Sequence, residues 1–325
     1  MKVLAANGTP ASSIAIGGNI FGYACDESQT DILIAAAKDQ GINFIDTADV
    51  YSDGLSEELI GKALVGSRDK WVLATKVGVK SDGTGSGLGS KKSIFNRVEK
   101  SLRRLRTDYI DIYQIHHFDY NTPILETLDA FEDLRNQGKI RNFGLSNCNS
   151  SQTNLYTEMA QMSSLLSPIT NQVHYNILKR GAEDEFLVSP GSNQPMLMVY
   201  GVLGRGVLTG KYSIDKKPQR TTRADMSSSV KADLLPSVLN AVAGLDKLGQ
   251  EVGITMSQLS VSYVLRNPVV LSAVVGFRDI SQLKELTNIS KIDLSEQFWS
   301  KVDAYLQILG DFKDASLGHQ IVQGF

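Results

Sequence analysis

The sequence predicts an α/β protein built as a single (β/α)8 TIM barrel, and three observations lead to this fold. Strand-like and helix-like segments alternate along most of the 325 residues. The strand-like segments are continuous apolar runs, which is typical of parallel strands with both faces covered. Eight such units close naturally into a barrel, and one barrel of this kind accommodates a chain of this length. We therefore expect one domain over residues 1–325.

The first half of the chain contains the clearest alternation. After a hairpin-like N-terminal stretch, the predicted strands and helices follow in chain order at 14–22, 29–40, 43–48, 56–64, 71–77, 91–105, 109–116 and 124–137. Ser56 is the expected cap of the second helix. Glu57 and Glu58 then fall in its first turn, where the helix dipole favours negative charge.

The second half continues the pattern with longer connections. Further strands are predicted at 140–146, 169–175, 196–200 and 269–275, and helices at 152–165, 235–252, 256–265 and 280–286. Segments 81–90 and 212–229 have the composition of long loops, and residues 292–325 are expected to add a helix near 297–306 and a tail. A doubly wound sheet is the rival fold, but Gly17 and Gly18 lack the G-x-G-x-x-G spacing of its dinucleotide-binding turn.

The net charge, the cysteine content and the length of the apolar runs limit the kinds of partner that the chain can bind. A net charge of -2 with a pI of about 6.1 argues against nucleic-acid binding, and Arg103, Arg104 and Arg106 are interpreted as a solvated helix face. Cys25 and Cys148 lack partners at metal-ligand spacing, so neither a disulfide framework nor a metal site is expected. No run approaches the roughly 20 apolar residues of a membrane span. We expect a cytoplasmic protein without membrane partners, and the oligomeric state stays open.

Four ionisable side chains lie at or just beyond the ends of predicted strands: Asp46, Tyr51, Lys76 and His116. The carboxyl ends of barrel strands meet at one mouth, so these side chains are expected to converge there. The Lys76 ammonium should lower the pKa of the Tyr51 phenol, and Asp46 should keep Lys76 charged. His116 could donate a hydrogen bond to a substrate carbonyl. This set predicts carbonyl and alcohol redox chemistry.

Each of these residues also has an ordinary structural explanation. Asp46 could cap a loop, Tyr51 could be a surface residue, and His116 could be a core histidine, with His117 competing for its role. Lys76 is harder to explain in this way, because lysine is rarely buried without a partner. The functional prediction therefore depends on the four residues taken together.

The sequence around these residues resembles the aldo-keto reductase family. Residues 41–51 and 56–64 resemble its first signature, Ala74-Thr75-Lys76 carries its lysine, and residues 108–116 carry its histidine. The resemblance implies that Tyr51 is the general acid and base, that Lys76 and Asp46 tune it, and that His116 orients the substrate.

The resemblance also implies a bound NADP cofactor. The cofactor residues that it implies are Gly18, Asn19, Ser146, Asn147, Gln172, Tyr200, Gly201, Leu203, Gly204, Arg205, Gly206, Lys211, Gly276, Arg278, Gln282 and Glu285. In this pattern residues 146–147 and Gln172 hold the nicotinamide amide, Tyr200 stacks on the ring, and residues 201–211 hold the pyrophosphate. Arg278 and Lys211 favour NADPH over NADH, because cations suit a 2′-phosphate.

The sequence thus predicts an NADP-dependent oxidoreductase that acts on an aldehyde, a ketone or the corresponding alcohol. Two other interpretations of the function stay open. Lys76 could be the Schiff-base nucleophile of a barrel aldolase. Alternatively, the chain could be a cofactor-binding regulatory subunit resembling the potassium-channel beta subunits. Aromatic residues in the predicted loops, among them Phe118 and Tyr120, indicate a partly apolar rim around the substrate site.

Overall fold

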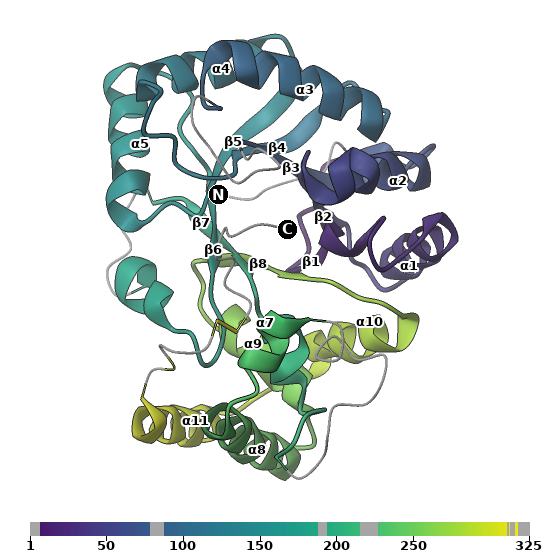
Figure 1. Ribbon diagram of the computed structural model, residues 1–325, viewed down its shortest axis with the longest axis vertical. Helices are drawn as coiled ribbons and strands as arrows, with labels where there is room; N and C mark the ends of the chain where they lie inside the picture. Colours follow the sequence, from purple (N-terminus) through teal and green to yellow (C-terminus); the bar gives the residue numbers. More distant parts are fainter. Residues whose placement is uncertain are drawn as a thin grey trace.

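The computed structural model describes residues 7–78, 88–187, 194–214, 227–310, 312 and 316–317. Within them, eight parallel strands pair in chain order, and β8 pairs with β1, so the sheet closes on itself. Helices surround this barrel (Figure 1). The α/β class and the (β/α)8 barrel expected from the sequence are confirmed.

The strands are short and the helices that follow them are longer. The strands are β1 (Ile14–Gly17), β2 (Phe44–Asp46), β3 (Val72–Val77), β4 (Ile110–Ile115), β5 (Ile140–Ser146), β6 (Thr170–His174), β7 (Met196–Tyr200) and β8 (Val270–Val275). The helices are α1 (Glu27–Asp39), α2 (Leu55–Ala63), α3 (Lys91–Leu105), α4 (Ile124–Asn136), α5 (Ser150–Met162), α7 (Ser228–Ala232), α8 (Pro236–Glu251), α9 (Met256–Leu265), α10 (Ile280–Thr287) and α11 (Glu296–Leu309).

Capping side chains explain where two of the helices begin. Asp26 accepts a hydrogen bond from the backbone N–H of Gln29, and the Gln29 side chain accepts one from Asp26 in return. Asn149 and Gln152 form the same reciprocal pair at the start of α5. Such pairs satisfy N–H groups that have no partner inside the helix. As a result, α1 and α5 each begin before the positions expected from apolar periodicity.

The barrel strands are buried on both faces, which is why they appear in the sequence as continuous apolar runs. Side chains that point outward pack against the helices in the main core. Inside the barrel a separate buried cluster consists of Ala15, Phe44, Val72, Ala74, Ile112 and Met198. Beyond this cluster, polar side chains occupy the carboxyl ends of several strands and form the site described below.

Two expectations about connecting segments need correction, and two others fall largely outside the described residues. The strand expected over 14–22 ends at Gly17, because its partner β2 ends opposite it at Asp46 and Gly18–Ile20 then form a short 3₁₀ turn, η1. The hairpin expected before β1 falls largely on residues 1–6, which lie outside the described residues, so it stays a prediction. Most of the expected loops 81–90 and 212–229 also lies outside it, but the end of the second loop begins α7.

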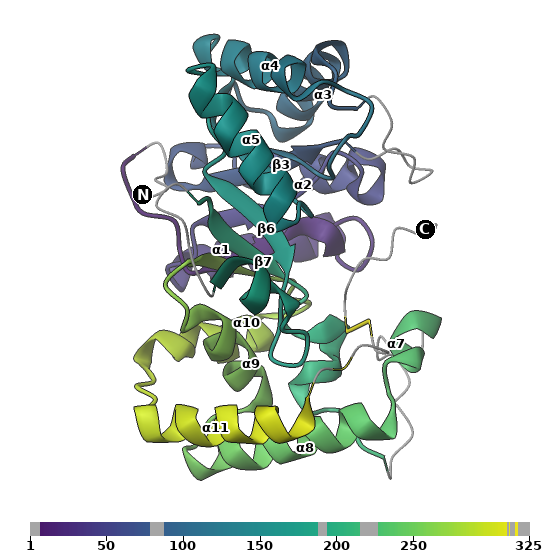
Figure 2. The same cartoon turned by 90° about the vertical axis from the view of Figure 1, so that its left-hand side faces the viewer.

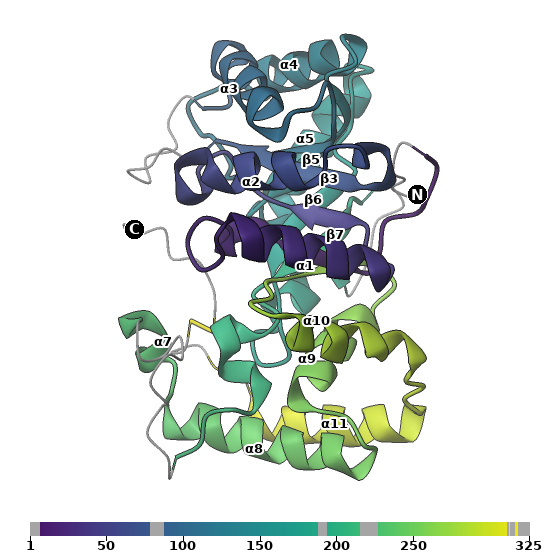
Figure 3. The same cartoon turned by 90° about the vertical axis from the view of Figure 1, so that its right-hand side faces the viewer.

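The side views show how the helices are distributed. Helices α3 and α4 cover one side of the barrel, and α8 and α11 lie together on the opposite side (Figure 2). The helix expected near 297–306 is α11. Residues 7–13 and α7 lie at opposite ends of the barrel in both side views (Figures 2 and 3). Since residues 7–13 lead into the start of β1, α7 lies at the carboxyl end of the strands.

Gly61 allows α2 to approach α3 closely. A Cβ atom at this position would lie 2.4 Å from the backbone oxygen of Arg104 and 2.7 Å from the carbonyl carbon of Leu105. Because both obstacles are backbone, Gly61→Ala is expected to lower the free energy of unfolding by about 1–3 kcal/mol, measured by urea denaturation. Gly181→Ala, where the new Cβ meets open space, is the matched control. Equal stability of the two variants would contradict the expected clash.

Candidate active site

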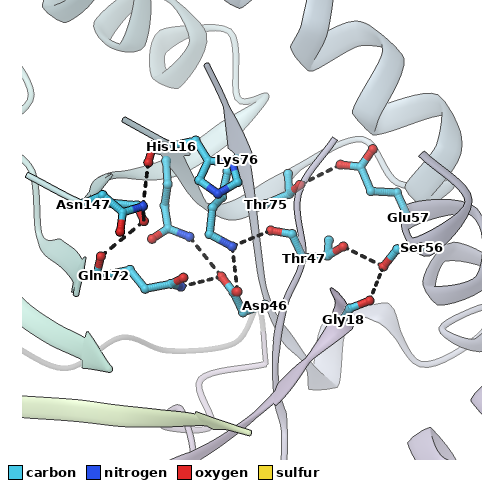
Figure 4. Close-up of polar contacts among 12 residues, drawn as sticks. Gly18, Asp46, Thr47, Ser56, Glu57, Thr75, Lys76, His116, Asn147 and Gln172 are labelled. Carbon is cyan, nitrogen blue, oxygen red and sulfur yellow. Dashed lines mark hydrogen bonds and ion pairs between the residues drawn. The ribbon is translucent and has the colours of Figure 1, made fainter. Parts of the chain in front are cut away.

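Asp46, the last residue of β2, lies at the centre of a buried polar network (Figure 4). Its Oδ2 accepts a hydrogen bond from Lys76 Nζ at 2.7 Å. Its Oδ1 accepts hydrogen bonds from Gln172 Nε2 at 2.8 Å and from Gln114 Nε2 at 3.1 Å. Closure of the sheet therefore brings one side chain from each of β2, β3, β4 and β6 together.

The Lys76 side chain is fully buried, and its ammonium group has two hydrogen-bond acceptors. Besides Asp46, Nζ donates to the backbone oxygen of Thr47 at 2.8 Å. Burial alone would lower the pKa of Lys76, but the Asp46 carboxylate and the Tyr51 phenol outweigh it, and the pKa is raised. Lys76 is therefore charged at neutral pH.

Tyr51 lies in the loop after β2, at the start of the short turn η2 (Tyr51–Gly54). Lys76 Nζ lies 5.1 Å from the centre of its ring. Burial raises the pKa of Tyr51, whereas the nearby positive charge of Lys76 lowers it, and burial prevails. The prediction that Lys76 lowers the pKa of Tyr51 below its ordinary value is therefore wrong, because the ammonium group offsets only part of the effect of burial. Tyr51 carries its proton at neutral pH.

His116 directly follows β4 and is buried beside Tyr51. Burial lowers the pKa of His116 well below its ordinary value, and the charges of Lys76 and His117 lower it further, so the imidazole is neutral. Its ring meets the Tyr51 ring edge-on at 6.1 Å, and the His117 ring stacks on it at 5.1 Å. Among the described residues, Nδ1 of His116 is buried without a hydrogen-bond partner. A neutral imidazole offers one N–H donor and one lone pair.

Four of the residues expected to hold a nicotinamide form a network next to His116. Asn147 Nδ2 donates to the backbone oxygen of His116 at 3.0 Å and to Ser146 Oγ at 3.1 Å, and Tyr200 donates to Asn147 Oδ1 at 2.8 Å. Ser146 Oγ in turn donates to the backbone oxygen of Gln172 at 3.2 Å. Because the Gln172 side chain also bonds to the β2 carboxylate, the expected cofactor residues and the expected proton-transfer residues share one network.

The segment after β7 forms a turn-rich loop around η5 (Gly204–Thr209), and Leu203 immediately precedes it. Positive φ angles occur at Gly201, Gly204, Arg205, Gly206 and Gly210. Alternation of right- and left-handed backbone creates concave nests of N–H groups that bind anions. A Cβ at Gly206 would lie 2.8 Å from Lys211 Nζ, so this glycine leaves room for the ammonium group. The backbone and the basic side chains of the loop suit a phosphate group.

Of the residues expected near the adenosine, Arg278 lies between β8 and α10, and Gln282 and Glu285 lie on α10. The Gln282 side-chain oxygen accepts a hydrogen bond from the backbone N–H of Arg278 at 2.9 Å. Glu285 Oε1 accepts one from the Thr255 hydroxyl at 2.6 Å, so α9 holds this carboxylate in place. The structure therefore groups these three residues on one segment, apart from the Asp46 network.

Gly18, Asn19 and Gly276 come together where β1 and β8 end. A Cβ at Gly276 would lie 3.7 Å from Asn19 Oδ1. The Ser56 hydroxyl donates to the backbone oxygen of Gly18 at 2.7 Å. Ser56 is therefore not the cap of α2, as expected from the sequence; the helix begins one residue earlier, after a left-handed glycine, and Ser56 instead fixes the turn that follows β1.

Sequence reasoning missed Gln114, which supports Asp46 from β4. The available signal was a polar amide in an otherwise apolar strand, two residues before His116. In the parallel register Gln114 lies directly beside Lys76, so its amide points to the same carboxylate. A polar residue inside a buried strand generally needs a buried partner, and here that partner is Asp46.

Arg104 corrects the interpretation of the basic cluster on α3 as a solvated face. Its Nε donates to Glu57 Oε2 at 2.7 Å, and Glu57 is fully buried. Glu57 also accepts a hydrogen bond at 2.6 Å from Thr75, the residue before Lys76. This ion pair therefore connects α2 and α3 to the strand that carries the buried ammonium. Arg103 is exposed, as expected.

Asp49, in the loop that leads to Tyr51, forms another largely buried ion pair, with Arg97 of α3. Burial raises the pKa of Asp49 to about 6, although Arg97 opposes this. The folded state therefore binds this proton more tightly than the unfolded state does. The resulting stabilisation is present below about pH 4 and is lost as the pH rises through 6.

Asp49→Asn is expected to remove this pH dependence. Relative to the variant, the wild-type protein should lose on the order of 3 kcal/mol of unfolding free energy between pH 4 and pH 7, measured by urea denaturation. Asp39→Asn, which alters an exposed carboxylate at the end of α1, is the control and should follow the wild-type profile. A constant difference between wild type and Asp49→Asn across this range would contradict the raised pKa.

The sequence over most of the chain matches a known family. Residues 13–307 match the model of the Aldo/keto reductase family. The chain belongs to this family. Relatives include Aldo-keto reductase YhdN of Bacillus subtilis, 34% identical over 299 residues that cover 90% of this chain and 88% of that protein. A probable voltage-gated potassium channel subunit beta from Arabidopsis thaliana is 31% identical over 300 residues, covering 90% and 91% respectively.

Solved structures of the same family have the same fold. A glycerol dehydrogenase from Gluconobacter oxydans superposes with a TM-score of 0.78 at 30% identity, over 92% of this chain and 93% of that one. An aldo-keto reductase from Klebsiella pneumoniae in complex with NADPH gives a TM-score of 0.73 at 27% identity, over 93% and 94%. Across the described residues, the structure contains no helix with the length and apolar character needed to cross a membrane.

Proposed function

We propose that this aldo/keto reductase family member is an NADP-dependent oxidoreductase that transfers a hydride between a nicotinamide and an aldehyde or ketone, or runs the reverse reaction on an alcohol. The observation that carries the proposal is the buried Lys76 ammonium, which is paired with Asp46 and lies 5.1 Å from the centre of the Tyr51 ring. A phenol beside a fixed positive charge can act as a general acid near neutral pH. The NADPH complex of the Klebsiella pneumoniae relative supports the choice of cofactor.

In the reduction, Tyr51 gives its proton to the carbonyl oxygen. Burial keeps the phenol protonated beforehand, so the acid is ready. As the proton leaves, negative charge develops on the phenol oxygen next to Lys76, and the attraction between them grows in a buried site where it is poorly screened. Asp46 keeps the ammonium group charged and oriented. His116, neutral at the pH of the reaction, would donate an N–H to the same carbonyl oxygen and fix its direction.

The remaining residues of the site suit a dinucleotide. When bound, NADPH supplies the hydride that reaches the carbonyl carbon. Ser146, Asn147 and Gln172 would hold its amide, Tyr200 would pack on the ring, and the loop over residues 201–211 would hold the phosphates with Lys211. Arg278, Gln282 and Glu285 would bind the adenosine end. NADPH is favoured over NADH because Arg278 and Lys211 can pair with the additional phosphate.

The two other readings differ in how well the site supports them. A Schiff-base aldolase needs a lysine that readily gives up its proton, and the raised pKa of Lys76 argues against this role. A regulatory subunit that binds the same cofactor is supported by the similarity to the Arabidopsis thaliana channel subunit. Turnover of small carbonyl compounds by the isolated protein separates that reading from the proposed enzyme.

Aromatic side chains near the mouth support a partly apolar substrate. Phe118 packs edge-on against Tyr120 at 4.8 Å and against Tyr156 at 5.7 Å. Tyr23 and Tyr120 are 69% and 80% exposed, so their rings are accessible from solvent. A small carbonyl or alcohol compound and a cytoplasmic location remain proposals from composition and family.

A spectrophotometric screen tests the proposal. Purified protein is mixed with aldehydes, ketones and sugars and either NADPH or NADH, and the loss of absorbance of the reduced cofactor is recorded. We expect oxidation of NADPH with at least one carbonyl class, and slower oxidation of NADH. Failure of NADPH to bind in a fluorescence titration would overturn the proposal. Tight binding of NADPH without turnover of any carbonyl compound would favour the interpretation as a regulatory subunit.

A further inference from the structure

Two residues near the C-terminus, Ser316 and Leu317, are anchored at the carboxyl end of the barrel by one buried carboxylate. Asp233, which directly follows α7, is 2% exposed. Its Oδ1 accepts a hydrogen bond from the Ser316 N–H at 2.6 Å, and its Oδ2 accepts from the Ser316 hydroxyl at 2.8 Å and the Leu317 N–H at 3.0 Å. Three hydrogen bonds to one buried carboxylate are a specific anchor for so short a segment.

The anchored segment has a conformation that needs such support. Leu317 has a φ of +45°, a left-handed conformation that leucine rarely adopts, and its side chain is fully buried. Its carbonyl oxygen accepts hydrogen bonds from Asn176 Nδ2 and from His174 Nε2, each at 3.2 Å. Leu317 is therefore held on one side by the Asp233 carboxylate and on the other by two side chains that follow or end β6.

The same two side chains contact the residues that we propose bind the nucleotide. Asn176 Nδ2 also donates to the backbone oxygen of Gly201 at 3.0 Å. The His174 ring packs edge-on against the Tyr200 ring at 5.3 Å. Asn176 itself is fixed, because its side-chain oxygen accepts hydrogen bonds from the N–H groups of Leu178 and Lys179. Ser316 and Leu317 are thus connected to the end of β7 through the side chains of Asn176 and His174.

The carbonyl of Leu317 also lies directly against the loop over residues 201–211, which we propose holds the phosphates. A Cβ built at Gly204 would come within 3.4 Å of this oxygen, and Gly204 has a φ of +52° at the start of η5. A loop that is held in its binding shape before the ligand arrives loses less conformational freedom on binding. If Ser316 and Leu317 were released, the loop would lose the contact between Gly204 and the Leu317 carbonyl. Asn176 would lose one of its hydrogen-bond acceptors.

We propose that Asp233 is a positioning residue that couples docking of Ser316 and Leu317 to nucleotide binding. The docked tail stabilises the loop that starts at Gly201 and so raises the affinity for NADPH. Because such coupling is reciprocal, bound NADPH holds the tail in place by the same factor. The inference rests on the proposed function, since it takes NADPH as the ligand of this loop.

The test compares NADPH binding by the full-length wild type, Asp233→Asn and Asp233→Ala. The asparagine variant keeps the size of the side chain but replaces an acceptor oxygen with an amide group that cannot accept from the Leu317 N–H. Fluorescence titration and stopped-flow displacement should show an NADPH Kd raised about fivefold or more, mainly through faster dissociation. Asp39→Asn, an exposed carboxylate on α1, is the control and should bind like wild type.

A second measurement uses the wild type alone and does not depend on how the variants fold. Hydrogen exchange at the Leu317 amide should slow by about the same factor when NADPH is added. Folded Asp233 variants with unchanged NADPH Kd, or exchange at Leu317 that NADPH does not alter, would overturn the inference while leaving the proposed function intact. Wild-type protein that does not bind NADPH would overturn both.

Discussion

Tyr51→Phe is expected to lower turnover by about 10²- to 10⁴-fold and to leave the affinity for NADPH nearly unchanged. The phenylalanine ring keeps the contacts that Tyr51 makes with His116 and Lys76 but has no proton to give to the substrate oxygen. Stopped-flow or steady-state rates with the best substrate of the screen measure the first effect. A fluorescence titration with NADPH measures the second.

Tyr305→Phe is the matched control for this prediction. It removes the same hydroxyl group from a tyrosine of α11, outside the network around Asp46, and it should keep the turnover within a small factor of wild type. Retention of near-normal turnover by Tyr51→Phe would show that another group supplies the proton. Loss of NADPH binding in that variant would indicate that the substitution disturbs the cofactor site rather than the proton transfer.

The barrel could be predicted because its physical requirements appear directly in the sequence. Parallel strands covered on both faces must be apolar throughout, and helices that cover a barrel must carry one apolar stripe. The convergence of Asp46 and Lys76 followed from the same argument, since adjacent parallel strands that end in polar residues present them at one rim. The salt bridge between these two residues, at 2.7 Å, is the geometric result.

The features that the sequence did not predict depend on distant partners. Arg104 looked solvated because its partner Glu57 lies 47 positions away, and Asp233 gave no signal because its partner Leu317 lies 84 positions away. The direction in which the pKa of Tyr51 shifts could not be predicted from the sequence for a related reason. It is the balance of burial and a nearby charge, and only the packed structure shows which of the two is larger.

Lys76→Met is expected to be the most damaging single substitution in the described part of the chain. It leaves the Asp46 carboxylate buried with two amide donors and without a countercharge, which should cost about 3–5 kcal/mol of unfolding free energy in urea denaturation. Turnover should also be lost. Lys62→Met is the control, because the Lys62–Glu27 pair is exposed and its loss should cost under about 1 kcal/mol.

The double variant Asp46→Asn/Lys76→Met separates the two effects of Lys76. Asparagine can still accept hydrogen bonds from the Gln114 and Gln172 amides, and it removes the unpaired buried charge, so the double variant should be more stable than Lys76→Met alone. Its turnover should stay as low as that of the single variant, because the positive charge beside Tyr51 is still missing. A double variant no more stable than Lys76→Met would mean that the lysine stabilises the fold by packing. Recovery of turnover together with stability would mean that its charge has no part in the proton transfer.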